Sequence, residues 1–160
     1  MTSFSNLKKQ LIEQIIDANS LTELQLIIDQ YKAQNNYSVE DLVGRYELKG
    51  VNQDENESSY SGTLDLSVNE IGRVKALWLI GKDQLQFGSG FYENNILVIN
   101  FYYEGDDIYR GQQFKGVVVY KVLSDGNLQG FWSEKHGDQR FLGKEYAVKV
   151  QNIKTDFSLN

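Results

Sequence analysis

The stretch GVVVYKVLSDGNLQGFW, residues 116–132, decides the fold class. Two apolar runs flank the polar tetrapeptide SDGN, in which Asp125-Gly126 has the composition of a tight hairpin turn. The stretch QFGSGFYENNILVINFYY, residues 86–103, repeats this plan with an Asn-rich turn. Each stretch therefore predicts two neighbouring strands of a β-hairpin.

The same two-residue period extends from Gly44 onward, and the connections between apolar runs carry the Gly, Asn and Asp that turns need. About eight short strands joined mostly by tight turns predict an antiparallel meander, and closing it into a barrel removes the exposed edges. The predicted fold class is therefore mainly β, an antiparallel meander barrel over residues 44–150. The predicted strands lie near residues 44–50, 59–68, 73–80, 83–92, 96–103, 114–123, 128–133 and 140–150.

Residues 1–43 have a helical period instead. Apolar side chains recur on one stripe in each of two segments, and Ser20 and Glu23 have the spacing of a capping box at the start of the second segment. We therefore expect a pair of α-helices before the barrel. The stripes consist of Leu7, Leu11, Ile12, Ile15 and Ile16, and of Leu21, Leu24, Ile27, Ile28 and Tyr31.

Two predicted strands, residues 74–80 and 96–103, are apolar on both faces. A strand buried on both faces needs a cover outside the barrel as well as a core inside. We expect residues 1–43 to pack on the barrel as this cover; a dimer interface is the alternative. Residues 151–160 are predicted to form a C-terminal tail.

The composition limits the classes of partner. The chain has 160 residues, 41% of them hydrophobic, and a net charge of −6, which disfavours nucleic acids and anionic membranes as partners. It has no cysteine, which excludes disulfides and thiolate chemistry. The N-terminus lacks the apolar core of a signal peptide, and no run reaches the length of a membrane span. These features predict a cytoplasmic protein, with an effector secreted without a signal peptide as the alternative.

Several short motifs together carry a family resemblance. Gly44-x-Tyr46 opens the first strand, FGSG contributes Gly88 and Gly90, and GVVVY, DGNLQGFW and a closing GKE with Glu145 follow. In this arrangement, residues 44–150 resemble a group of small bacterial β-barrel domains. These domains are lipocalin-like or avidin-like (calycin-type), and some are labelled fibronectin-binding. The resemblance implies a small closed barrel.

Four aromatic residues have apolar or glycine neighbours at alternate positions, which predicts an inward face: Trp78, Tyr102, Tyr120 and Trp132. Such rings line a pocket for a small, mostly apolar ligand or simply fill the barrel. Asn100 is predicted on the same face as Tyr102, where a buried amide either pairs with a neighbouring hydroxyl or binds a ligand.

Glu145 shares a predicted strand face with Gly143 and Ala147. An inward carboxylate needs a cation or hydrogen-bond donors, and without them its pKa rises. Glu145 is therefore the best candidate acid or base, and a barrel-closing ion pair is the alternative that we favour. The single histidine, His136, is predicted to be a solvated turn residue.

No motif of a hydrolase, nucleotide-binding protein or metalloenzyme occurs in the sequence. We therefore predict no catalytic residue, no metal site and no cofactor, and we interpret the acidic stretches 54–57 and 104–107 as solvated loops. The favoured function is a non-catalytic module that binds a small apolar ligand. The alternatives are a protein-interaction module that binds a partner chain or a second copy, and a barrel isomerase or cyclase that uses a single carboxylate.

Overall fold

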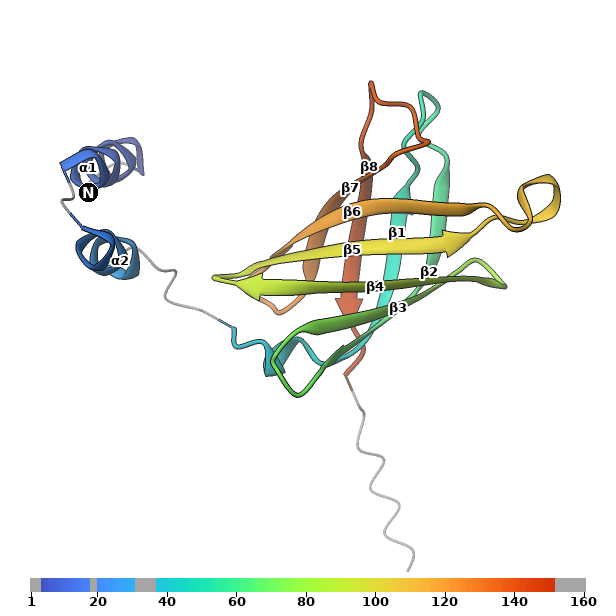
Figure 1. Ribbon diagram of the computed structural model, residues 1–160, viewed down its shortest axis with the longest axis horizontal. Coiled ribbons are helices and arrows are strands. Elements are labelled where there is room, and N and C mark those ends of the chain that lie inside the picture. The colour runs from blue at the N-terminus through green and yellow to red at the C-terminus, as the bar shows by residue number, and fades with distance from the viewer. Residues whose placement is uncertain (1–3, 18–19, 31–36, 152–160) are drawn as a thin grey trace, which may run out of the picture. The chain divides into compact units, whose positions relative to one another are not determined.

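The computed structural model describes residues 4–17, 20–30 and 37–151 (Figure 1). The chain divides into two compact units, residues 1–36 and residues 37–160, and each is described by itself.

The first unit contains helices α1 (Phe4–Asp17) and α2 (Leu21–Gln30). The Glu23 amide donates to Ser20 Oγ over 3.1 Å, as the predicted capping motif requires. Neither described helix is long and apolar enough to cross a membrane. The structure does not describe most side chains of the two predicted apolar stripes. The packing of residues 1–43 on the barrel therefore stays a prediction. The predicted C-terminal tail also lies outside the described residues, apart from residue 151.

The second unit is a closed eight-stranded barrel, in which every strand pairs antiparallel with its neighbour in the chain and β1 pairs with β8 (Figure 1). This architecture confirms the predicted fold class. The strands are β1 (Gly44–Val51), β2 (Ser59–Val68), β3 (Val74–Ile80), β4 (Gln84–Glu93), β5 (Ile96–Glu104), β6 (Gln113–Val122), β7 (Leu128–Glu134) and β8 (Gly143–Lys149).

The predicted and observed strand ends agree to within a residue, except at β8, which begins at Gly143 rather than at residue 140. The three residues before it belong to the β7–β8 loop. There the Phe141 amide donates to the Asp138 carbonyl over 3.1 Å, and the Arg140 guanidinium pairs with the Asp138 carboxylate at 2.7 Å. This local turn replaces ladder hydrogen bonds for those residues.

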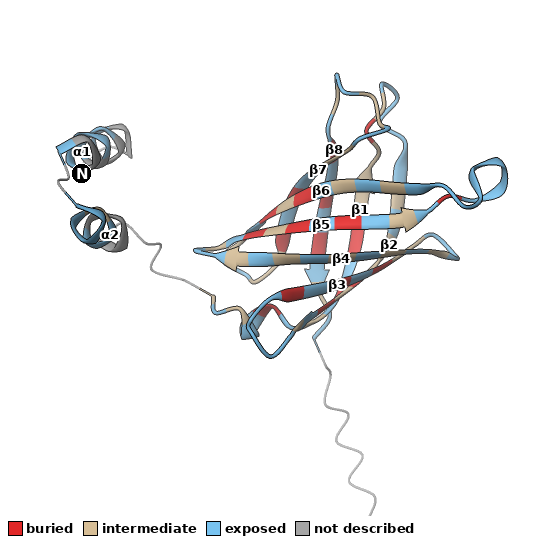
Figure 2. Cartoon of the chain, viewed as in Figure 1, coloured by how far each residue is buried: buried red, intermediate tan, exposed pale blue. Residues whose placement is uncertain are grey.

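Buried and exposed positions alternate along the strands (Figure 2), because successive side chains of a strand point to opposite faces. The inward side chains form a single core that fills most of the barrel. Its largest fully buried members are Tyr46, Tyr120, Leu42, Leu48, Leu64, Leu97, Ile99, Leu128, Val74 and Val118.

Inward-facing glycines make room for the larger rings of the interior. A Cβ built on Gly88 would lie 2.8 Å from Trp78 Cζ3, and one on Gly130 would lie 2.6 Å from Tyr120 Cδ1. Both distances are too short for real contacts, so each ring occupies the space that a side chain on a neighbouring strand would need. Five such glycine–aromatic pairs surround the barrel: Gly50 with Tyr60, Gly88 with Trp78, Gly116 with Phe101, Gly130 with Tyr120, and Gly143 with Trp132.

One end of the barrel is covered by residues 37–43, which include a short 3-10 helix, η1 (Glu40–Leu42). Leu42 is only 1% exposed, and the Tyr46 hydroxyl donates to its carbonyl over 2.8 Å. The Tyr37 hydroxyl also donates to the Ser124 carbonyl in the β6–β7 turn over 2.6 Å. These contacts place residues 37–43 in the barrel unit, which begins at residue 37.

The outer face of the barrel carries many exposed apolar side chains, which we call the outer apolar band. The expectation that strands 74–80 and 96–103 are apolar on both faces is therefore correct, but the described barrel unit leaves this band open to solvent. The band consists of Leu77, Leu85, Phe87, Phe91, Tyr102, Val117, Phe131, Tyr146 and Val148.

Candidate functional site

A pocket of about 90 Å³ lies inside the barrel at the end opposite η1, and we call it the mouth pocket. Most of its lining side chains are half-buried, so solvent reaches the pocket at this end. Its lining residues come from seven of the eight strands and the β1–β2 loop: Asn52, Tyr60, Trp78, Ile80, Gln84, Gln86, Phe101, Tyr103, Val118, Trp132, Glu134 and Glu145.

Glu145 is the centre of a hydrogen-bond network in the pocket wall. The Tyr120 hydroxyl donates to its carboxylate, and the Trp78 indole N–H donates to that hydroxyl over 3.2 Å. On the other side, the Tyr60 hydroxyl bonds to the same carboxylate and accepts the Trp132 indole N–H over 2.9 Å. Two pairs of side chains, each consisting of a tryptophan that donates to a tyrosine, therefore bond to one carboxylate, and the four residues come from four different strands.

This network corrects the favoured prediction for Glu145, a barrel-closing ion pair. The side chain does point inward and is 6% exposed, but its partners are tyrosine hydroxyls and not a cation. Burial disfavours the charged form and raises the pKa of Glu145 to about 7, although the two phenolic hydrogen bonds act in the opposite direction. The prediction failed because tyrosines on neighbouring strands supply the donors that a cation would otherwise provide.

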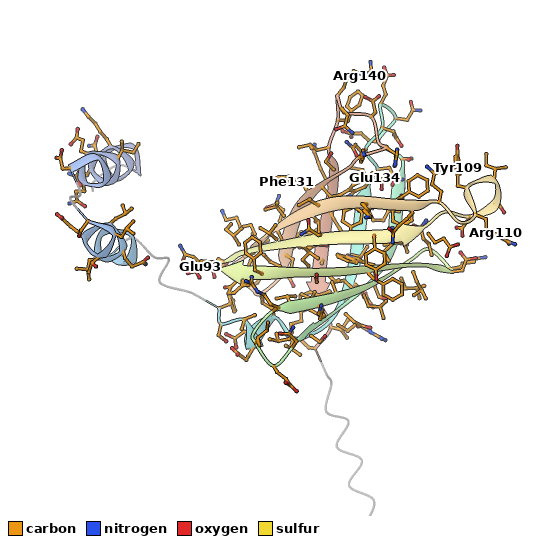
Figure 3. All side chains as sticks on the ribbon, in the orientation of Figure 1. Glu93, Tyr109, Arg110, Phe131, Glu134 and Arg140 are labelled. Carbon is orange, nitrogen blue, oxygen red and sulfur yellow. The ribbon has the colours of Figure 1, made fainter. Side chains whose placement is uncertain are left out.

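Glu134 is a second carboxylate in the pocket and is the last residue of β7. The β7–β8 loop, which contains Arg140, begins directly after it (Figure 3). The Tyr103 hydroxyl donates to the Glu134 carboxylate over 2.8 Å, and burial raises the pKa of Glu134. Its backbone is fixed by Gln53, which is 5% exposed and accepts the Glu134 amide N–H over 3.0 Å.

The aromatic rings of the pocket contact one another edge to face. Tyr60 meets Trp132, Trp132 meets Phe101, and Phe101 meets Trp78, with centroid distances of 6.1 to 6.4 Å and interplanar angles of 62 to 86°. Edge-to-face pairs of this kind fix ring orientation. The four rings form a continuous arc along one side of the pocket, which we call the aromatic arc.

The structure brings together four of the six residues that the sequence singled out as site candidates. Trp78, Trp132 and Glu145 line the mouth pocket, and Tyr120 lies behind it as the fully buried partner of Glu145. These four lie inside the barrel, as the sequence predicted; whether any of them binds a ligand stays a prediction.

The predicted inward position is wrong for Asn100 and Tyr102. Asn100 and Tyr102 are exposed on the outer face of β5, where they line a wide hollow. The Tyr102 ring stacks there on the Phe87 ring, with 5.7 Å between the ring centroids. The inward residues of β5 are Leu97, Ile99 and Phe101 instead. Because both faces of this strand are apolar, its pattern does not show which face points inward.

His136 lies exposed in the β7–β8 loop, as predicted, and its ring meets the Phe114 ring edge to face at 5.5 Å. Among the described residues, no group of three or more His, Cys, Asp or Glu side chains is placed to hold a metal ion.

Sequence reasoning missed Tyr60, Phe101, Tyr103, Glu134 and the two glutamines of β4. A signal for two of them was present. Tyr60 precedes Gly62, Leu64 and Leu66 at two-residue spacing, and Glu134 follows Trp132 at the same spacing. Glu134 therefore continues a face that was already predicted to point inward, and Tyr60 continues the apolar face of the predicted strand 59–68.

No family model matches the sequence, and no curated protein matches it either. Among solved structures, the chain is similar to a redesigned β-barrel, mFAP1, in its complex with DFHBI. The TM-score is 0.53 at 14% sequence identity, and the match covers 71% of this chain and 100% of that chain. This likeness is one of fold; the resemblance to calycin-type domains stays a prediction.

Proposed function

We propose that the protein is a non-catalytic binding module that holds a small, mostly apolar ligand in the mouth pocket. The observation that carries this proposal is the pocket itself: an interior cavity lined by seven aromatic or aliphatic side chains and five polar ones, with its two carboxylates fixed by hydrogen bonds. Ligand sites generally combine these features. The complex of the similar barrel mFAP1 with DFHBI supports it, since that barrel also holds a small molecule.

The volume limits the ligand. Typical pockets for drug-sized molecules are roughly 300–1,000 Å³, and an engineered cavity of about 150 Å³ binds benzene. At about 90 Å³, the mouth pocket accommodates a group of only a few heavy atoms. The ligand is therefore very small, or it inserts one small group while the rest remains outside the barrel.

Tryptophan fluorescence tests this proposal, because the chain has only two tryptophans and both line the pocket. A panel of small neutral and charged compounds should contain members that change the emission in a saturable way. Trp132→Ala should weaken this binding by about 1–3 kcal/mol, whereas Phe131→Ala, on the outer face, should not. A panel with no saturable response, together with native mass spectra free of bound ligand, would contradict the proposal.

Self-association is a second candidate function, and the outer apolar band supports it. Phe87, Phe91 and Phe131 are each 43–50% exposed, and Phe87 and Tyr102 form an exposed stacked pair. Exposed apolar surface in excess of that on an ordinary monomer is typical of interaction sites. We assign a second copy of the chain as the partner, because homodimers are the commonest soluble assemblies. Sedimentation velocity should then show a concentration-dependent dimer that Phe87→Ser weakens; a monomer at all concentrations would contradict this candidate.

A further inference from the structure

We propose that the mouth pocket selects a small organic cation, an amine or quaternary ammonium group, because two carboxylates and five aromatic rings line it and no basic side chain does. This inference rests on the proposed function and specifies the chemical class of its ligand.

The first argument is charge. Glu134 and Glu145 both line the pocket from adjacent strands, and the groups that bond to their carboxylates are tyrosine hydroxyls. A buried carboxylate with donors but without a positive charge is only partly compensated. A cation in the pocket supplies the missing charge.

Basic side chains near the pocket do not supply this charge. Among the described residues, Arg45 forms an ion pair with Asp65 and Arg140 forms one with Asp138. None of these four residues lines the pocket. His136 acts electrostatically on Glu134, but its side chain is exposed in the β7–β8 loop and does not line the pocket.

The second argument is the aromatic lining. The faces of aromatic rings are negative, and they attract cations within about 6 Å of the ring centre, most strongly when the site is desolvated. The aromatic arc contributes Tyr60, Trp132, Phe101 and Trp78, and Tyr103 adds a fifth ring, which stacks on Phe114 at 5.3 Å. Rings held in place by their neighbours are preorganised, and sites that recognise quaternary ammonium groups are built from several such rings.

The third argument combines the volume of the pocket with the sign of the ligand's charge. A pocket of about 90 Å³ takes a compact head group, and a methylated ammonium is compact, weakly hydrated and apolar over most of its surface. An anion of similar size meets two carboxylates, which repel it. The pocket therefore discriminates by charge among ligands that fit equally well.

The test compares choline with 3,3-dimethylbutan-1-ol, which has the same shape but carries a carbon in place of the charged nitrogen. Both are titrated into the full chain at pH 8, with tryptophan emission and calorimetry as readouts. We expect choline to bind at least about tenfold more tightly than the neutral alcohol, a difference that corresponds to about 1.4 kcal/mol.

Two variants locate the effect, and one controls for net charge. Glu145→Gln and Glu134→Gln each remove one pocket charge with little change of shape, and each should reduce the preference for choline several-fold without weakening the binding of the alcohol. Glu93→Gln removes an exposed charge at the opposite end of the barrel (Figure 3) and should leave both affinities unchanged. Near-UV circular dichroism checks that each variant retains the packing of its aromatic residues.

The outcomes separate this inference from the proposed function. If the alcohol binds as tightly as choline, the cation preference is overturned while a ligand-binding barrel remains. A choline preference that survives both pocket variants places its binding elsewhere and also overturns the inference. If neither compound binds and the wider panel is also silent, the proposed function falls with it.

Discussion

Gly143 lies directly opposite Trp132 in the β7–β8 ladder, and the indole ring occupies the space that a Cβ at position 143 would need. The same indole donates its N–H to the Tyr60 hydroxyl and lines the mouth pocket. The absence of a side chain at Gly143 therefore determines the position of the Trp132 ring in the pocket wall.

Gly143→Ala should therefore destabilise the protein by about 1–3 kcal/mol, because the added methyl group overlaps a ring that is held by a hydrogen bond. Chemical denaturation measures the loss. The control is a double-mutant cycle: in a Trp132→Ala background the same substitution should cost much less, since the obstructing ring is gone. Equal costs in both backgrounds would show that the ring is not the obstacle.

Stability should fall as the pH rises from about 5 to 8. The pKa of Glu145 is about 7 in the folded protein against 4.5 for an ordinary glutamate, so the unfolded chain loses this proton first. The native state then binds more protons than the unfolded state, and a shift of this size removes on the order of 3 kcal/mol of stability above pH 7. The facing groups Tyr60 and Tyr120 remain protonated in this range, because burial raises the pKa of both.

Glu145→Gln isolates this effect, because it cannot ionise. Its unfolding free energy should decline less between pH 5 and 8 than that of the wild type, and the difference between the two curves reports on Glu145 alone. Glu134 titrates in both proteins, so its contribution cancels. Parallel curves for the wild type and Glu145→Gln would contradict the raised pKa.

Tyr120→Phe should destabilise the protein by about 1–3 kcal/mol, because it leaves the Trp78 N–H without an acceptor and removes one donor to Glu145. Loss of that donor should also raise the pKa of Glu145 further, since the phenolic hydrogen bond lowers it. Nuclear magnetic resonance titration of the glutamate side chains measures this pKa. Tyr102→Phe, on the outer face, should change stability by less than about 0.5 kcal/mol.

Leu42→Ala should cost about 2–4 kcal/mol, because the side chain is 1% exposed and its removal leaves a cavity at the covered end of the barrel. Val43→Ala, next to it and 44% exposed, is the matched control and should cost far less. Thermal unfolding distinguishes the two. Similar losses for both would mean that residues 37–43 do not close the core.

The strand positions could be predicted from the sequence because each turn carries its own chemical signal. The Asp125-Gly126 turn and the Asn94-Asn95 turn each fix the strands on both sides, and Gly126, Asn94 and Asn95 adopt the positive φ that such turns need. Local signals were sufficient there, because a hairpin is a local structure.

The site was harder to predict because it depends on which face points inward and on pairs from distant strands. In β5 both faces are apolar, so Asn100 and Tyr102 were assigned to the wrong face. The glycine–aromatic pairing would have resolved the choice, because Phe101 pairs with Gly116 on β6 and with Gly88 on β4. The partners of Glu145 come from β2 and β6, and no spacing within β8 reveals them.

The chain enters and leaves the barrel at the same end. Residues 37–43 lead into β1 there, β8 ends beside them, and the Val150 amide donates to the Arg45 carbonyl over 2.8 Å. The mouth pocket opens at the other end, between loops that join one strand to the next. A tether joined to residue 37 or to residue 151 is therefore attached at the end of the barrel that η1 covers. Immobilised on a sensor surface or fused to another protein through either flank, the barrel keeps its mouth unobstructed by the attachment point.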